Sequence, residues 1–99
     1  MTRYVLSPAA QADLEQIWDY TCARWDNDQA EAYVRAIQRA AELITDNPLL
    51  GRPCDEVRAG YRRHTAGSHT LYYRVDPGAD LIDVVRILHK RMDVERHLD

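Results

Sequence analysis

Apolar residues recur at helical spacing in the first half of the chain and alternate with polar residues in the second half. After a short strand over 3–6, residues 8–25 place apolar side chains three and four positions apart, and residues 27–46 repeat this pattern. From 61 to 89 the pattern becomes that of three short strands. The sequence therefore predicts one domain, residues 1–99, with the order β-α-α-β-β-β.

The ends of the predicted helices carry recognisable capping signals. Ser7-Pro8 supplies an N-cap followed by proline at the first helical position. Asp26, with Gln29 three residues later, has the spacing of a capping box, and Asn47-Pro48 stops the second helix. Because the connection at Asp26 is so short, the two helices must form an antiparallel hairpin.

We expect an α+β fold in which this hairpin packs on one face of a mainly antiparallel four-stranded sheet. Strand alternation predicts that one face of the middle strand meets the helices, with His69, Leu71, Tyr73 and Val75. The same rule places Ile82, Val84, Arg86 and Leu88 on a common face of the last strand. The helical pattern places Asp13, Gln16, Tyr20 and Arg24 on the polar side of the first helix. Because the hairpin covers only one face of the sheet, we expect the other face to be open to a partner.

The charge and composition of the chain argue against a nucleic-acid-binding protein and against a membrane protein. The 99 residues carry a net charge of −3, and their cations are twelve arginines and one lysine. Residues 1–51 hold four cations and eight acids, whereas residues 52–99 hold nine and eight. This acidity argues against avid non-specific binding of nucleic acid, and we expect no direct specific contact with it. The sequence shows no membrane span and no signal peptide, which predicts a cytoplasmic protein.

The sequence offers no pattern typical of a catalytic or metal site. Cys22 and Cys54 lack metal-ligand spacing and are expected to be free thiols, and the four histidines are scattered. We find no nucleophile elbow, phosphate loop or paired carboxylates. We therefore predict no metal, no cofactor and no catalytic residue, in a protein that acts by binding.

Cations inside strands are the main candidates for function. Arg62 and Arg63 must face opposite ways, and Arg86, among apolar neighbours, is expected to form an ion pair or a backbone clamp. A basic cluster of His89, Lys90, Arg91 and Arg96 follows the last strand. Among the aromatic residues, Trp18, Trp25 and Tyr33 are expected in core or hairpin packing, whereas Tyr20 is the better candidate for a partner contact.

Several short motifs, in this order and spacing, resemble the ParE branch of the RelE/ParE superfamily of toxins from type II toxin–antitoxin pairs. They are Leu6-Ser7-Pro8-Ala9-Ala10, Asp13-Leu14, Ile17-Trp18-Asp19-Tyr20, Trp25, residues 47–53, Tyr72-Tyr73-Arg74-Val75 and residues 85–93. The resemblance implies a RelE/ParE-like fold and a cytoplasmic toxin that inhibits DNA gyrase. It also implies a hetero-oligomer with a ParD-type antitoxin, whose disordered segment folds onto the toxin as a helix and as an added strand.

On this basis the candidate residues divide into two groups. Contact with the target, and hence toxicity, is expected of Arg62, Arg63, Arg86, His89 and Arg91. Contact with the antitoxin is expected of Tyr20, Arg62, Arg74, Lys90 and Arg96. A binding module without toxicity remains an alternative.

A second alternative is the ribosome-dependent mRNA cleavage of the RelE branch. The resemblance places that branch's strand lysine at about Arg63 and its C-terminal arginine at Arg91. Its middle-strand arginine falls at about Thr70, which carries no charge, although His69 is adjacent. Its C-terminal tyrosine falls at about His97, which could still serve as an acid or base. Half of the nuclease constellation is thus missing.

Overall fold

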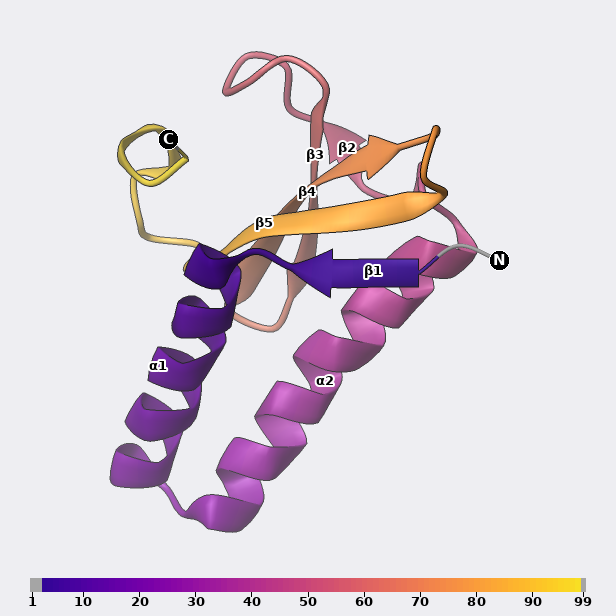
Figure 1. Cartoon of the computed structure of the whole chain (residues 1–99). Helices are drawn as coiled ribbons and strands as arrows, with labels where there is room; N and C mark the ends of the chain where they lie inside the picture. The colour runs from indigo at the N-terminus through magenta and orange to yellow at the C-terminus, as the bar shows by residue number, and fades with distance from the viewer. Residues whose placement is uncertain (1–2, 99) are drawn as a thin grey trace.

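The computed structural model describes residues 3–98 as two antiparallel helices packed on one face of a single sheet (Figure 1). The elements are β1 (Arg3–Leu6), α1 (Pro8–Arg24), α2 (Asn27–Asp46), β2 (Arg52–Pro53), β3 (Tyr61–Ala66), β4 (His69–Asp76), β5 (Leu81–His89) and the 3-10 turn η1 (Val94–Arg96). The two helices and the first strand are confirmed to within one residue at either end, and the three strands predicted from 61 to 89 are present.

The sheet contains five strands in the order β1-β5-β4-β3-β2. β1 pairs in parallel with β5, and the remaining neighbours are antiparallel. The predicted α+β class is therefore confirmed, with two changes of detail. Arg52–Pro53 adds a short edge strand to the four that the sequence predicts, and the parallel β1 makes the sheet mixed.

The helices begin and end where the capping signals predict. The Ser7 hydroxyl accepts a hydrogen bond from the Ala10 N–H at 3.0 Å, and Asp26 Oδ1 accepts from the Gln29 N–H at 2.8 Å. Each such cap is worth about 1 kcal/mol. The Ser7 hydroxyl also donates to the Val85 carbonyl at 2.6 Å, which fixes the start of α1 against β5.

A β-bulge changes the faces of β5. Val85 is an extra residue between the register pairs Tyr72–Arg86 and Tyr73–Val84. The residues of β5 in the helix-side core are Ile82, Val84 and Ile87, whereas Val85 and Leu88 pack in a cluster with Tyr72. The predicted common face of residues 82, 84, 86 and 88 is therefore wrong beyond Val84, because alternation fails at a bulge.

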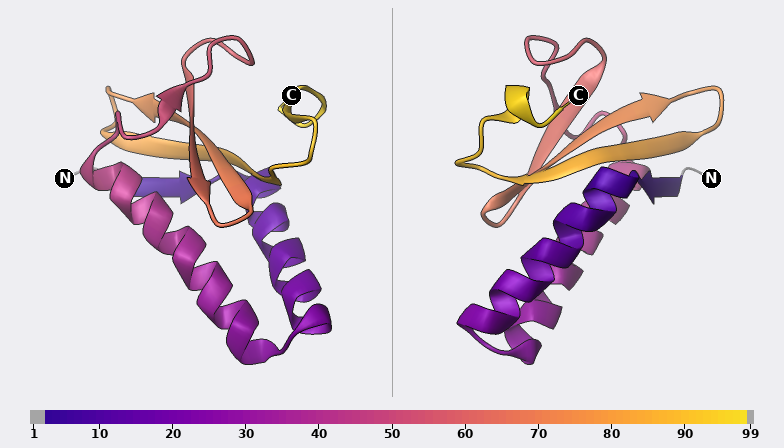
Figure 2. Two further views of the ribbon diagram at one scale, coloured as in Figure 1. Left: turned by 180° about the vertical axis from the view of Figure 1, so that it is seen from behind. Right: turned by 60° about the vertical axis from the view of Figure 1, so that its left-hand side comes forward.

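The sheet face away from the helices is covered in part by the chain itself. Loop 54–60 and the C-terminal segment fold on this side, as Figure 2 shows. They enclose a second buried cluster of Cys54, Tyr72, Leu88 and Leu98. Leu98 is only 2% exposed, so its burial stabilises this arrangement by roughly 1.5–3 kcal/mol. The prediction of a wholly open second face is therefore wrong.

Within residues 3–98, no helix is long and apolar enough to cross a membrane.

Candidate functional site

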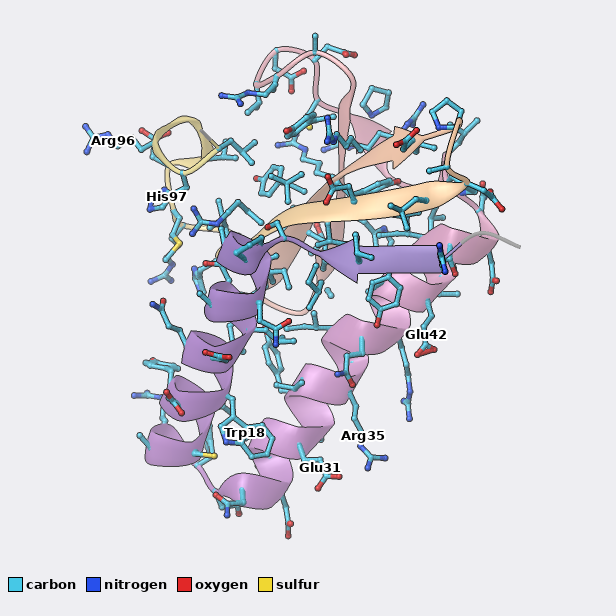
Figure 3. The ribbon with its side chains drawn as sticks, in the orientation of Figure 1. Trp18, Glu31, Arg35, Glu42, Arg96 and His97 are labelled. Carbon is cyan, nitrogen blue, oxygen red and sulfur yellow. The ribbon has the colours of Figure 1, made fainter. Side chains whose placement is uncertain are left out.

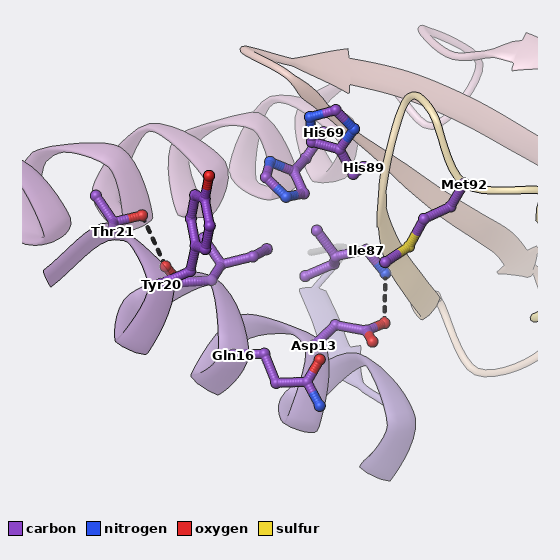
Figure 4. Close-up of a pocket in the computed structure, with 9 residues that line it drawn as sticks. Asp13, Gln16, Tyr20, Thr21, His69, Ile87, His89 and Met92 are labelled. Carbon is purple, nitrogen blue, oxygen red and sulfur yellow. Dashed lines mark hydrogen bonds between the residues drawn. The ribbon is translucent and has the colours of Figure 1, made fainter. Parts of the chain in front are cut away.

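A groove of ≈ 320 Å³ lies between α1 and the adjoining ends of β4 and β5 (Figure 4). We call it the α1–β5 groove, and its lining residues are Asp13, Gln16, Ile17, Tyr20, Thr21, His69, Ile87, His89 and Met92. The lining combines an apolar floor with two imidazoles, and it includes candidates from both predicted groups, Tyr20 and His89. The groove is therefore a candidate surface for binding a partner.

An ion pair between Asp13 and Arg86 supports one wall of the groove. Arg86 Nε and Nη2 each donate to an Asp13 carboxylate oxygen at 2.7 Å, and the Ile87 N–H donates to Asp13 Oδ2 at 2.9 Å. Arg86 Nη1 also donates to the His97 carbonyl at 2.7 Å. The hydrogen bonds that Arg86 donates to Asp13 raise the pKa of Arg86 above its ordinary value. Arg86 is thus both an ion-pair member and a backbone clamp.

The position of Asp13 corrects the sequence analysis. Its predicted place on the polar side of the first helix is wrong, because Asp13 is 8% exposed and lies on the same face as Ala10 and Ile17. A carboxylate can be buried here because Arg86 and the Ile87 N–H satisfy it. The sequence of the first helix does not indicate these partners, because they are more than seventy positions away along the chain.

Three aromatic side chains meet at the upper edge of the groove. Tyr33 Oη and His69 Nδ1 are 2.6 Å apart, and the Ser68 N–H donates to Tyr33 Oη at 3.0 Å. The His69 and His89 rings meet edge to face, with centroids 5.3 Å apart. Burial, together with the charge of His89, lowers the pKa of His69. Sequence reasoning assigned Tyr33 to packing and His69 to a strand, and no local signal joins them.

The turn after β5 presents exposed side chains beside the groove. The Arg91 N–H donates to His89 Nδ1 at 3.1 Å, and the Lys90 N–H donates to the Ser68 carbonyl at 3.0 Å. The side chains of Lys90, Arg91 and Met92 are exposed. His89 thus lines the groove together with Tyr20, which is 67% exposed, and Lys90 and Arg91 follow it in the turn.

Arg62 and Arg63 lie away from this groove. Arg62 Nη1 donates to the Gly51 carbonyl at 2.7 Å and to the Leu49 carbonyl at 3.4 Å, which ties the 47–53 loop to β3. Arg63 pairs in register with Arg52 across β2 and β3 and lines a separate hollow with it. Arg62 is therefore engaged within the fold, and Arg63 belongs to a different surface from His89 and Arg91.

The two remaining antitoxin candidates make exposed ion pairs. Arg74 Nε lies 3.1 Å from Asp83 Oδ2, and Arg96 Nε lies 3.5 Å from Asp93 Oδ2. Figure 3 shows Arg96 on the C-terminal turn, well separated from the helical hairpin. Exposed pairs of this kind contribute little to stability, which leaves both side chains available to a partner.

The structure does not bring the nuclease-like positions together in one cleft. Thr70 is 7% exposed. His97 Nδ1 lies 2.8 Å from the Asp93 carbonyl. Arg63 on β3 pairs with Tyr72 of β4, whereas Arg91 follows His89, which pairs with His69 of β4. β4 therefore lies between Arg63 and Arg91, and their partners on β4 are three positions apart. Three positions correspond to about 10 Å along a strand.

Two further expectations concern the tryptophans and cysteines. Trp18 lies between the helices and is 37% exposed (Figure 3), but Trp25 is 68% exposed, so its predicted packing is wrong. It follows the last residue of α1, beyond the helical face that is buried.

Both cysteines are free, as predicted, and burial raises the pKa of the Cys54 thiol. Among the described residues, no group of three or more metal-ligating side chains is placed to hold a metal.

Comparisons with known proteins agree on one family. The profile of the family described as "ParE toxin of type II toxin-antitoxin system, parDE" matches residues 4–94. A protein named Toxin ParE1 from Mycobacterium tuberculosis is 61% identical over 97 residues, covering 98% of each chain. Toxin ParE1 from Caulobacter vibrioides is 42% identical over 98 residues, covering 99% of each. In fold, the chain is similar to a structure titled "Chromosomal ParDE TA system from P. aeruginosa", with a TM-score of 0.76 and 24% identity, over 90% of this chain and 96% of that one.

Proposed function

Because the chain belongs to the ParE family of toxins from type II toxin–antitoxin systems, we propose that it inhibits DNA gyrase and is neutralised by a cognate ParD-type antitoxin. Inhibition of gyrase blocks replication and arrests growth. The toxin acts by binding its target, and its arginines and histidines recognise the target without catalysing a reaction. The similarity to a ParDE system supports the antitoxin as partner.

The observation that carries the proposal is that one candidate from each group lines the α1–β5 groove. Tyr20, chosen as an antitoxin contact, and His89, chosen as a target contact, line the same groove. Lys90 and Arg91 are exposed in the turn that follows His89. An antitoxin segment seated in the groove covers the residues that the target needs, so neutralisation follows from occlusion without any change of fold.

The chemistry of the groove suits an amphipathic segment. Ile17, Ile87 and Met92 offer apolar contacts, and Met92 is 48% exposed although it is a large apolar side chain. A helix from the antitoxin can place apolar side chains on this floor and acidic side chains near Lys90 and Arg91. Such a segment, disordered when free, folds as it binds.

The positions expected of an mRNA nuclease favour binding over cleavage. The side chain at Thr70 carries no charge and is buried, and β4 separates Arg63 from Arg91. Cleavage of RNA needs preorganised cations around one phosphate together with an acid and a base. The RelE-type activity therefore stands as the second candidate, supported by the partial match at Arg63, Arg91 and His97.

Two assays on the purified toxin test the proposal directly. We expect inhibition of gyrase supercoiling, with intact mRNA on programmed ribosomes in the parallel reaction. Cut mRNA with normal supercoiling would reject the proposal and would assign catalytic roles to Arg63, Arg91 and His97. Addition of the co-expressed antitoxin should restore supercoiling.

Induction in cells separates a toxin from a harmless binding module. Expression of the toxin alone should arrest growth, and co-expression with the neighbouring antitoxin gene should relieve the arrest and increase the yield of soluble complex. If the protein is harmless alone and gains nothing from that neighbour, both the toxin assignment and the antitoxin partner are wrong for this chain.

A further inference from the structure

The hydrogen bonds around His89 fix which of its ring nitrogens carries a proton. The Arg91 N–H donates to His89 Nδ1 at 3.1 Å, and a main-chain N–H can only donate. Nδ1 must therefore be unprotonated, so neutral His89 carries its hydrogen on Nε2. Protonation of Nδ1 would set two N–H groups against each other and break the turn that holds Lys90 and Arg91.

The contact of His69 with Tyr33 is compatible with the same tautomer. Tyr33 Oη accepts from the Ser68 N–H and lies 2.6 Å from His69 Nδ1. When the Tyr33 hydroxyl donates to Nδ1, the hydrogen of neutral His69 is on Nε2. Burial and the neighbouring His89 lower the pKa of His69, which keeps the ring neutral in the free toxin.

Both Nε2–H groups are available to a ligand. Neither makes a hydrogen bond within the described residues, yet no buried side-chain nitrogen or oxygen in that part of the chain lacks a partner. Both groups must therefore reach solvent, and the surface that both rings line is the α1–β5 groove. Figure 4 shows the two imidazoles in the groove, in the same view as Ile87 and Met92.

The charges around the pair favour an anionic ligand. Asp13 on α1 accepts hydrogen bonds from Arg86 and from the Ile87 N–H, so its oxygens are engaged away from the imidazoles, but its negative charge still acts on His69 and partly offsets the lowering of that pKa. The other titratable groups around the pair are Tyr20 on α1 and Tyr33 on α2, and the exposed Lys90 and Arg91 follow β5. Two N–H donors above an apolar floor match a carboxylate carried on an apolar segment.

We propose that the His69–His89 pair is the docking point for one Asp or Glu carboxylate on the apolar segment of the cognate antitoxin. This inference rests on the proposed function, because it assumes that the antitoxin occupies the groove. The carboxylate accepts hydrogen bonds from both Nε2–H groups, while the aliphatic part of the same segment covers Ile17 and Ile87.

Proton uptake on binding is the consequence that can be measured. A carboxylate beside His69 favours the imidazolium, so the complex binds more protons near neutral pH than the separate proteins do. The proton goes to His69, because Tyr33 Oη can accept from a protonated Nδ1, whereas the Arg91 N–H cannot. The affinity should therefore rise as the pH falls from 8 to 6, by about tenfold for one proton taken up over one pH unit.

Calorimetric titration of the toxin with its antitoxin, in buffers of different ionisation enthalpy, tests the proposal on unmodified proteins. We expect an uptake of up to one proton at pH 7 and tighter binding at pH 6 than at pH 8. H69Q should remove the uptake, and H89Q should weaken binding at every pH while the uptake remains. H64Q changes a partly buried histidine of β3 outside the groove and serves as the matched control.

Substitution of each acidic residue of the antitoxin segment by its amide identifies the ligand. One such variant should lose the pH dependence. Binding without proton uptake, as a main-chain carbonyl in the groove would give, overturns the carboxylate and leaves the toxin–antitoxin assignment intact. Failure of the antitoxin to bind at any pH overturns the proposed function itself.

Discussion

Asp13 and Arg86 join the first helix to the last strand through two hydrogen bonds of 2.7 Å. The side chains are 9% and 21% exposed, so the pair is largely removed from water. Because the same arginine donates to the His97 carbonyl, one side chain ties together the start of α1, β5 and the C-terminal turn. The hydrogen bonds of Arg86 thus hold both one wall of the α1–β5 groove and the C-terminal segment that covers the opposite sheet face.

Loss of Asp13 should therefore destabilise the protein strongly. D13A leaves the Arg86 guanidinium without its partner and the Ile87 N–H without an acceptor, and we expect a loss of about 3–5 kcal/mol in the free energy of unfolding. Urea denaturation measures this loss. D83A removes one partner of the exposed Arg74–Asp83 pair and should cost less than about 1 kcal/mol. Equal costs for the two variants would contradict a structural role for Asp13.

The stability of Arg86 variants must be measured by urea denaturation before a loss of toxicity can be attributed to lost contact with the target. R86K retains the charge but loses the two-pronged contact with Asp13, so any loss of toxicity should be accompanied by a loss of stability. Full toxicity in a destabilised R86K would show that the guanidinium has no part in target contact. Loss of toxicity at unchanged stability would show that it does.

These contacts mark the limit of what the sequence reveals. Helix ends are set by neighbours three or four positions away, so Ser7 and Asp26 could be assigned from sequence alone. The Asp13–Arg86 pair spans 73 positions. Arg86 stood out among the apolar residues of its strand, whereas Asp13 was placed on the polar side of its helix. The extra residue at Val85 then reversed the faces of β5 beyond it, which alternation cannot foresee.

Some residues of the candidate site could likewise be predicted from the sequence, and others could not. Tyr20, His89, Lys90 and Arg91 could be chosen because exposed aromatic residues and terminal cations stand out in the sequence. Tyr33 and His69 could not, because their hydrogen bond joins residues 36 positions apart and depends on how α2 crosses the turn between β3 and β4. The covering of the second sheet face was also hidden, since it rests on Leu98 and its neighbours near the end of the chain.

Gly51 should tolerate no side chain. A Cβ at this position would lie 2.5 Å from Tyr73 Oη and 2.7 Å from the Arg63 carbonyl, and the first of these atoms is itself held by two hydrogen bonds. G51A should lower the free energy of unfolding by about 1–3 kcal/mol. G78A is the control, since its Cβ would meet Asp76 Oδ1 at an ordinary 3.5 Å. A thermal melt of G51A that matches that of G78A would contradict this close packing around Gly51.

Acid should weaken the free toxin through His69. The pKa of His69 is lowered below its ordinary value of 6.5 by burial and by His89. The unfolded chain therefore binds a proton more readily, so this contribution to stability is present above pH 6.5 and is lost as the pH falls toward the folded-state pKa. H69Q should flatten the dependence of stability on pH between 7 and 5. An unchanged dependence in H69Q would place the cause in other groups.

Arg91 is the candidate target contact whose role can be tested without disturbing the fold. Its side chain is exposed, and the bond that organises its turn comes from its main-chain N–H, which a substitution retains. R91A should therefore keep the stability of the parent within about 0.5 kcal/mol and weaken inhibition of gyrase supercoiling at least tenfold. R74A, which removes another exposed arginine on the far part of β4, should leave inhibition within about twofold, because a remote exposed cation contributes little. R91K distinguishes charge from geometry, since lysine restores the charge without the planar fork. If R91A inhibits gyrase as well as the parent does, the target contact lies elsewhere, and the hollow beside Arg63 becomes the next surface to test.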